Sequence, residues 1–268
     1  MKKILIVFFT CSFLFSCGTF GVIFADNSVS AQTDSSGTPN TAGGAAAAQA
    51  NQSPGDQGKR ADPDASNWDI ALLDTAADAD YLTGIEKDII LEMNKVRTDP
   101  AKYAELYIKP RLKYYNGKNY SEPGQITIQT REGAAAANEC IAVLTKTGAS
   151  GILVPEKGLS MAAKDHVADQ GRTGQIGHNG SDRSTPETRV KRYGAFAGSW
   201  TMGENIAYGP STGREIVCDL LVDDGVPDRG HRENIMNKAF TQTGAALGTH
   251  SQYRYSCTIT YANGYRSN

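Results

Sequence analysis

Apolar residues recur every three or four positions in several segments of this chain, which is the spacing of one buried face of an α-helix. The first such segment starts at Thr83, which forms a capping box with Glu86. Similar boxes, at Ser184 with Glu187 and at Thr212 with Glu215, start two later helices. The predicted helices are 83 to the Asp99-Pro100 pair, 100–108 ended by Pro110, 132–146, 159–171 with Ser160 as N-cap, 186 to Gly194, 213–223, and a short helix through Asn237 with Asp228 as N-cap.

The last part of the chain shows the alternation of half-buried β-strands instead. Residues 243–250 and 253–262 are separated by Ser251-Gln252, which is the length of a hairpin loop. In the second run, apolar side chains occupy every second position. Residues 111–131 are predicted to be an exposed loop with a short strand at 126–128. Helices followed by an antiparallel sheet predict an α+β fold built in layers.

The first 25 residues are predicted to be a targeting segment. Lys2-Lys3 is basic, and residues 4–15 are almost wholly apolar but too short to span a bilayer comfortably. Two processing sites are open: a bacterial lipoprotein box, in which Cys17 would be lipidated, and a signal-peptidase site after Ala25. An uncleaved anchor is the third alternative, because the apolar stretch resumes at Phe20. All three place the rest of the chain outside the cytoplasm.

Residues 26–80 are predicted to be a disordered low-complexity linker, and residues 81–268 to be the folded domain. Ser, Thr, Gly, Asn, Gln and Ala dominate the linker, so it cannot bury enough apolar surface to offset the entropy of ordering. If Cys17 is lipidated, a coil of ~50 residues with a root-mean-square span of roughly 40 Å would hold the domain away from the membrane.

Composition limits the classes of binding partner and the states of the cysteines that can be expected. The net charge of −2 gives no reason to expect a nucleic-acid partner. Of the five cysteines, two lie in the targeting segment, and Cys140 is expected to be a thiol buried on a helix face. Cys218 and Cys257 either form one disulfide in an oxidising compartment or remain separate buried thiols.

Three polar clusters in the C-terminal third lie outside the apolar runs, and each sets a His or a carboxylate among glycines. Loops on a scaffold are where binding and catalytic groups tend to sit. His166, on an apolar helix face, is expected to be a structural, hydrogen-bonded His, and His250, at the hairpin turn, to be exposed. The clusters are residues 177–182, 203–207 and 223–235.

Each candidate side chain has a predicted local setting. Glu204, flanked by Gly and Asn, is expected in a tight turn. His231 is expected in the first turn of a helix, where the dipole favours the neutral imidazole that ligates metal or acts as a base. Asp224 continues an apolar stripe and is expected to point inward, with Asp223 as the alternative. A buried carboxylate at a helix C-terminus needs a compensating partner.

Together these motifs resemble the CAP superfamily of cysteine-rich secretory proteins, antigen 5 and pathogenesis-related proteins, also called SCP-like, and specifically its bacterial branch. The resemblance covers roughly residues 83 to 264 and implies an αβα sandwich, with a small antiparallel sheet between helical layers and an open central cleft. The motifs that carry it are residues 177–182 with Arg189 and Gly194, residues 203–207, and residues 230–235 with Phe240-Thr241 and Gly244, together with Asn94 and Arg97.

The resemblance also implies a cleft tetrad of two His and two acidic residues, which in some members binds a divalent metal. By motif, His178, Glu204 and His231 carry over as ligands of Zn²⁺ or another divalent cation. The fourth position departs from the family pattern, because Asp223 or Asp224 stands where members have a Glu.

Two functions fit this tetrad. The first is a non-enzymatic extracytoplasmic module that binds a lipid, a glycan or another cell-envelope component. The second is a glycosidase-like hydrolase of peptidoglycan or another extracellular polymer, with Glu204 as general acid or base, Asp223 or Asp224 as its partner, and His178 and His231 orienting substrate or metal. The binding module is favoured, because no Ser lies in a nucleophile-elbow motif and the cysteines are expected to be buried.

Overall fold

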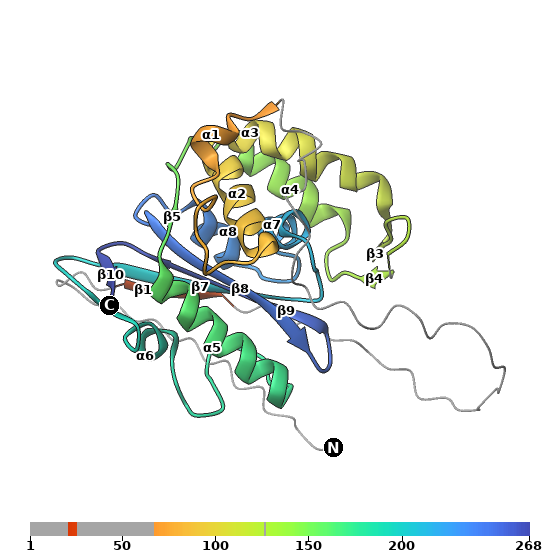
Figure 1. The fold of residues 1–268 in the computed structure, drawn as a ribbon. Helices are drawn as coiled ribbons and strands as arrows, with labels where there is room; N and C mark the ends of the chain where they lie inside the picture. Colours follow the sequence, from red (N-terminus) through yellow and green to blue (C-terminus); the bar gives the residue numbers. More distant parts are fainter. Residues whose placement is uncertain (1–20, 26–66, 126) are drawn as a thin grey trace, which may run out of the picture.

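The computed structural model describes residues 21–25, 67–125 and 127–268. It is α+β, with a sheet between two helical layers, as predicted (Figure 1). One layer holds α1 (Ile70–Leu73), α2 (Gly84–Thr98), α3 (Pro100–Tyr103), α4 (Ala134–Leu144), α7 (Gly213–Val222) and α8 (Gly230–Met236). The other layer holds α5 (Lys157–Thr173) and α6 (Pro186–Val190).

The central sheet is mixed, although only antiparallel pairing was predicted. Its middle strands β7, β9 and β8 are antiparallel, and β1 and β5 each add a parallel strand at an edge. The strands follow the order β1 (Gly21–Ala25), β7 (Thr201–Tyr208), β9 (Arg254–Ala262), β8 (Gln242–His250) and β5 (Val154–Pro155). Two small sheets join β6 (Gly194–Phe196) to β10 (Tyr265–Ser267), and β2 (Tyr115–Asn116), β3 (Asn119–Tyr120) and β4 (Ile128–Gln129) to one another.

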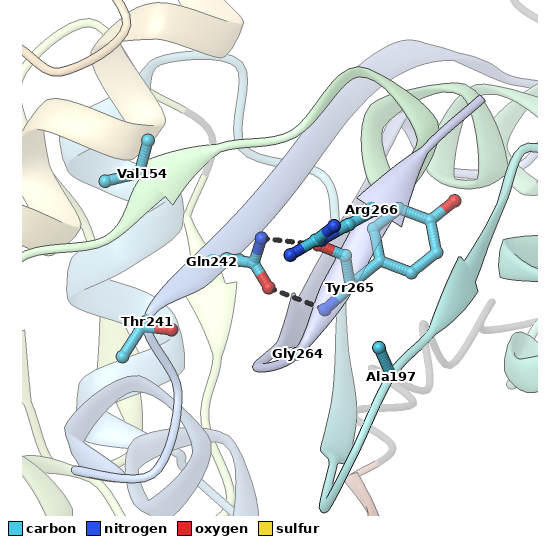
Figure 2. Close-up of a pocket in the computed structure, with 7 residues that line it drawn as sticks. All are labelled: Val154, Ala197, Thr241, Gln242, Gly264, Tyr265 and Arg266. Atoms are coloured by element: carbon cyan, nitrogen blue, oxygen red, sulfur yellow. Dashed lines mark hydrogen bonds between the residues drawn. The ribbon is translucent and has the colours of Figure 1, made fainter.

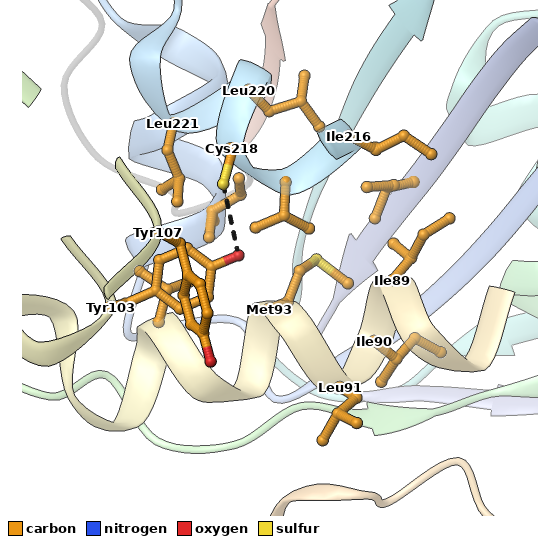
Figure 3. Packing of buried hydrophobic residues seen from close by; sticks show 14 of the residues in the cluster. Ile89, Ile90, Leu91, Met93, Tyr103, Tyr107, Ile216, Cys218, Leu220 and Leu221 are labelled. Carbon is orange, nitrogen blue, oxygen red and sulfur yellow. Dashed lines mark hydrogen bonds between the residues drawn. The ribbon is translucent and has the colours of Figure 1, made fainter. Parts of the chain in front are cut away.

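The predicted helical faces form the main core. Ile89 and Met93 of α2 and Ile216 and Leu220 of α7 are fully buried in one apolar cluster, which Figure 3 shows between the two helices. Both hydrogen bonds of the predicted box at the start of α2 are present. Apolar burial of this kind stabilises the layer by about 25 cal/mol per Å² removed from water.

On the other face of the sheet, α5 lies unusually close to β8. Ala163 and Val167 of α5 pack against Ala246 of β8. A Cβ at Gly244 would lie 2.2 Å from the backbone nitrogen of Ser160, so only glycine fits there. This close approach fixes α5, and with it the loop that follows α5, against the sheet.

Several predicted helix ends are shifted. The helix α5 begins at Lys157 with Glu156 as N-cap, so the prediction of Ser160 as N-cap is wrong. The box at the start of α6 pairs Thr185 with Thr188 instead of Ser184 with Glu187. The reason is Pro186, whose fixed φ suits the first helical position and sets the cap at the preceding residue.

Two other helix predictions need correction. Pro110 does not end the helical run, because a π-helix (Ala104–Ile108) leads into a 3₁₀-helix (Lys109–Tyr114). Pro110 lies at the start of that 3₁₀-helix, where its missing N–H is tolerated. The N-cap of α8 is Arg229, in a left-handed conformation, and not Asp228, whose carboxylate accepts from the Gly230 amide. The segment 111–131, predicted to be an exposed loop with one strand at 126–128, instead contains the end of the 3₁₀-helix and the strands β2, β3 and β4, of which β4 lies at Ile128–Gln129. Tyr120 of β3 is buried.

Residues 67–80 are folded, so the predicted linker extends too far at its C-terminal end. Trp68, Leu73 and Ala76 are buried in the main core. The Asn94 side-chain amide donates to the Leu73 carbonyl oxygen at 2.9 Å. Residues 26–66, and Cys17 with its predicted lipidation, lie outside the described residues.

Two further properties can be stated for the described part of the chain: the state of its cysteines and the absence of a membrane-spanning helix. Cys140, Cys218 and Cys257 are buried free thiols. Of the two alternatives for Cys218 and Cys257, separate buried thiols are therefore confirmed and the disulfide is not formed. Within the described ranges, no helix has the length and apolar character needed to cross a membrane.

Candidate functional site

The first half of the candidate site is a hydrogen-bonded pair of Glu204 and His178. Glu204 lies inside β7, opposite Thr260 of β9, so the predicted turn at this position is wrong. His178 comes from the loop after α5, and its Nδ1 donates to Glu204 Oε1 at 2.9 Å. The Glu204 side chain is 2% exposed and that of His178 is 14% exposed.

Arg189 completes this half, although the sequence pattern indicated no role for it beyond a motif match. Its Nη2 donates to both carboxylate oxygens of Glu204, at 3.1 and 2.8 Å. Its Nη1 donates to the carbonyl oxygens of His178 and Ser184. A fully buried carboxylate needs a paired charge, so an Arg shortly before Glu204 was the signal that could have identified this partner.

These contacts keep Glu204 ionised. Burial by itself would raise the pKa of Glu204, but the hydrogen bond from His178 and the charge of Arg189 outweigh it, so the pKa lies below its ordinary value. Because both oxygens already accept hydrogen bonds, Glu204 is a buried anion held in one orientation.

The second half is the pair of Asp223 and His231, both fully buried. Asp223 is the C-cap of α7 in a left-handed conformation, with φ 57°. Its Oδ1 accepts from His231 Nδ1 at 2.6 Å, and its Oδ2 accepts from the His231 amide at 3.0 Å. The Nε2 of His231 is buried, with no hydrogen-bond partner among the described residues.

Asp224, the other predicted inward carboxylate, lies outside the site. Its two oxygens accept from the amides of Arg131 and Glu132, at 2.6 and 2.8 Å, just before α4. The left-handed turn at Asp223 ends the helical periodicity, so the apolar stripe of α7 no longer predicts where the next side chain points.

Two asparagines join the halves. Asn205 follows Glu204 in β7, and its side-chain amide donates to the His231 carbonyl oxygen at 3.0 Å. Asn234 of α8 donates to Asn205 Oδ1 at 2.8 Å. The two His–carboxylate pairs are therefore neighbours, but the expectation of solvent access holds for His178 alone.

The contacts of these residues also show which of them could bind a metal ion. Within the described ranges, no group of three or more His, Cys, Asp or Glu side chains is arranged as metal ligands. The Glu204 and Asp223 carboxylates do not fit as direct ligands, because their oxygens are occupied by the histidine Nδ1 atoms and other donors. They fit a supporting role instead: each carboxylate would orient an imidazole by a hydrogen bond to one ring nitrogen, and the other ring nitrogen would bind the metal.

His166 supports the loop that carries His178, in agreement with its predicted structural role. Its Nε2 donates to the Gly177 carbonyl oxygen at 2.8 Å, and Gln170 donates to the same oxygen. Tyr208 accepts from the Gly177 amide. Burial lowers the pKa of His166, which favours the neutral imidazole with its proton on Nε2.

His250 also supports this loop, and the prediction that it is exposed is wrong. It is 3% exposed, and its Nε2 donates to the Gln175 carbonyl oxygen at 3.1 Å. Its Nδ1 accepts from the amides of Gln252 and Tyr253, so the imidazole closes the hairpin turn between β8 and β9. A turn position does not imply exposure when the side chain replaces missing backbone partners.

Two hollows in the described part of the chain lie away from both pairs. One, of about 470 Å³, has Arg266 as its one charged lining residue, and its Gln242 amide is bound to the Tyr265 backbone (Figure 2). The other, of about 560 Å³, lies between α2, the 3₁₀-helix and α7 and is lined by aromatic and charged residues. None of the predicted site residues lines either of these hollows.

Comparison with known proteins finds a family match over part of the chain. The model of CAP, the cysteine-rich secretory protein family, matches residues 145–263. No curated protein matches the chain. Two solved structures are similar to this chain. An outer surface protein from Borrelia burgdorferi is 18% identical over 43% of this chain and 78% of its own, with a TM-score of 0.33. An extracellular SCP-domain protein from Bacillus anthracis str. Ames is 22% identical over 40% of this chain and 33% of its own, with a TM-score of 0.31.

The matched range contains both His–carboxylate pairs and Arg189. It begins well after the start of the predicted resemblance at residue 83 but ends almost where predicted. Residues 145–263 are therefore a CAP domain of the cysteine-rich secretory protein family.

Proposed function

We propose that the protein is an extracytoplasmic, non-enzymatic binding module of the cell envelope. The observation that carries this proposal is the state of Glu204, which is buried and hydrogen-bonded through both oxygens. The general acid of a glycosidase holds a proton and has a raised pKa, whereas the pKa of Glu204 is lowered. The described contacts of Glu204 are those of a residue that maintains the fold of the site.

The location and partners of the module follow from the N-terminal pattern. The apolar segment 4–15 after Lys2-Lys3 supports export, with membrane attachment if Cys17 is lipidated. An exported module meets lipids, glycans and other envelope components, and the net charge of −2 supports no nucleic-acid partner.

Incubation of the purified full chain with peptidoglycan, followed by mass spectrometry of the soluble products, tests this proposal against a hydrolase. We expect no release of muropeptides. Release by the native protein that the Glu204→Gln variant loses, while a Glu187→Gln variant of a partly exposed surface glutamate retains it, would establish the hydrolase. Circular dichroism of both variants checks that they are folded.

The metal is a separate proposal: we expect Zn²⁺ to bind weakly, through imidazole nitrogens alone. Two neutral imidazoles supply half of a tetrahedral donor set, and the occupied carboxylates add none. Affinity should fall on acidification, because metal binding and protonation compete for the same ring nitrogens. Isothermal titration calorimetry with ZnCl₂ should show a weak heat that His231→Ala abolishes. No heat in the native protein, or the same heat in the variant, would contradict the site.

A further inference from the structure

The hollow between α2, the 3₁₀-helix and α7, here named the tyrosine groove, carries chemistry that the His–carboxylate pairs do not use. It has a volume of about 560 Å³, and its lining includes Tyr107, Tyr114, Arg111, Arg214 and Glu215. We propose that the tyrosine groove binds a neutral glycan. This inference rests on the proposed binding function and names the class of its ligand.

The aromatic side chains supply the stacking surface that a sugar ring needs. Tyr107 is held rigidly, because the Trp68 indole stacks on it at a centroid distance of 6.4 Å and donates from Nε1 to its hydroxyl at 2.8 Å. Figure 3 shows Tyr107 beside Tyr103 at the end of the α2–α7 core. Tyr114 adds a second ring to the lining. The apolar C–H face of a pyranose packs on such rings, as other apolar groups do.

Each of the two arginines of the groove is held by a carboxylate. Arg111 donates to Asp219 at 2.7 Å and lies 3.5 Å from Glu122. Arg214 donates to Glu92 at 3.0 Å, with its guanidinium 4.1 Å from the centre of the Tyr107 ring. Pairs held in this way present both donors and acceptors, as sugar hydroxyls require.

One donor of this lining has no partner of its own. The Nη1 of Arg111 is buried and has no hydrogen-bond partner among the described residues. A buried N–H in that state costs free energy until an oxygen accepts from it. An oxygen that reaches this atom, from a hydroxyl or a water, would satisfy the donor.

Other ligand classes fit the groove less well. An acyl chain would remove the charged pairs from water without replacing their hydrogen bonds, which is costly. An anion would meet four carboxylates, since Asp88, Glu92, Glu122 and Glu215 outnumber the two arginines. A cation would have to compete for carboxylates that already accept from Arg214, from Tyr120 and from Thr212. A neutral polyol needs only the spare lone pairs and N–H groups.

The experiment uses Trp68 as a reporter. The chain has two tryptophans, and Trp200 stacks on Phe196 outside the groove, so a Trp200→Phe background leaves Trp68 as the single tryptophan, which is excited selectively above the absorption band of tyrosine. The full chain is titrated with chitohexaose, cellohexaose and maltohexaose, three neutral hexasaccharides. We expect a saturable change in Trp68 fluorescence with at least one of them. The Tyr114→Ala variant should weaken that binding about tenfold, the amount that a stacked aromatic ring contributes.

Two further variants separate the groove from a general effect on folding. Arg111→Lys keeps the charge but loses the planar fork, so it should also weaken binding several-fold. Tyr255→Ala removes a partly buried tyrosine outside the groove lining and should leave the affinity unchanged. Circular dichroism and thermal melting confirm that each variant is folded.

The outcomes distinguish this inference from the proposed function. If no hexasaccharide changes the fluorescence, the glycan inference is wrong. If sodium palmitate or trilysine binds instead, and Tyr114→Ala weakens it, the groove serves another ligand class and the binding function stands. Release of muropeptides that depends on Glu204 would overturn the binding function itself, whatever the groove binds.

Discussion

Replacing Arg189 with alanine is expected to destabilise the domain by about 3–5 kcal/mol, because it leaves the buried Glu204 carboxylate without its paired charge. The same change removes the donors to the carbonyl oxygens of His178 and Ser184, so the loop that carries His178 loses an anchor. Urea unfolding at neutral pH, followed by circular dichroism, measures the loss. A change below about 1 kcal/mol would mean that water or other groups replace Arg189 without cost.

A double variant, Arg189→Met with Glu204→Gln, is the matched control. Replacing both partners of a buried ion pair by neutral groups of similar size is often neutral or stabilising, whereas removing one partner leaves an uncompensated charge. We therefore expect the double variant to recover much of the stability that Arg189→Ala loses. Equal destabilisation of both variants would assign the effect to the lost carbonyl contacts instead of the unpaired charge.

The pH dependence provides an independent check on the charge of Glu204. The pKa of Glu204 in the folded protein lies below its ordinary value of 4.5, so the unfolded chain binds more protons than the folded protein in this range. The stability from this carboxylate is present above about pH 4.5 and is lost as the pH falls through the lower folded pKa. The difference in unfolding free energy between native protein and Arg189→Ala should therefore shrink on acidification.

Much of the fold follows from local patterns that the sequence displays directly. The apolar stripe on α7 and the capping box of α2 need only neighbouring residues, and both predictions are confirmed. The hairpin of β8 and β9 was equally local. The parallel edge strands were missed, because β5 has two residues and its pairing with β8 depends on segments far apart in the chain.

The site was less predictable, because its geometry depends on long-range contacts. The motifs indicated His178, Glu204 and His231, but Asp223 and Asp224 are adjacent and no periodicity separates them. Asp223 has a left-handed conformation at the end of α7, and this conformation determines which of the two carboxylates points inward. The burial of Glu204 follows from its place within β7, and no local pattern around it reports that burial.

Arg189 shows the same limit from another side. It lies 15 residues before Glu204 in the chain, on a helix of five residues that packs back against β7. Helical periodicity can place a side chain on a face of its own helix, but it does not say which distant strand that face meets. The partner of a buried charge therefore has to be sought among the residues of opposite charge that have no other predicted partner.

The second large effect concerns the start of the folded domain. Removal of residues 26–79 is expected to destabilise the domain severely, although its low apolar content first suggested a dispensable linker. That segment supplies Trp68 and Leu73 to the main core, and each such large side chain is worth about 2–5 kcal/mol when truncated to alanine. It also supplies the Leu73 carbonyl oxygen to the buried amide of Asn94, which would lose that acceptor.

Deletion of residues 26–66 is the matched comparison, because it spares every residue of this contact. Thermal melting of the two deletions should show a much lower midpoint for the longer one, and the single variants Trp68→Ala and Leu73→Ala should each account for part of the difference. The tyrosine groove links this result to function, since Trp68 fixes the Tyr107 ring that lines it. Equal midpoints for the two deletions would mean that residues 67–79 contribute nothing to the core, and the rigid support proposed for Tyr107 would be lost with them.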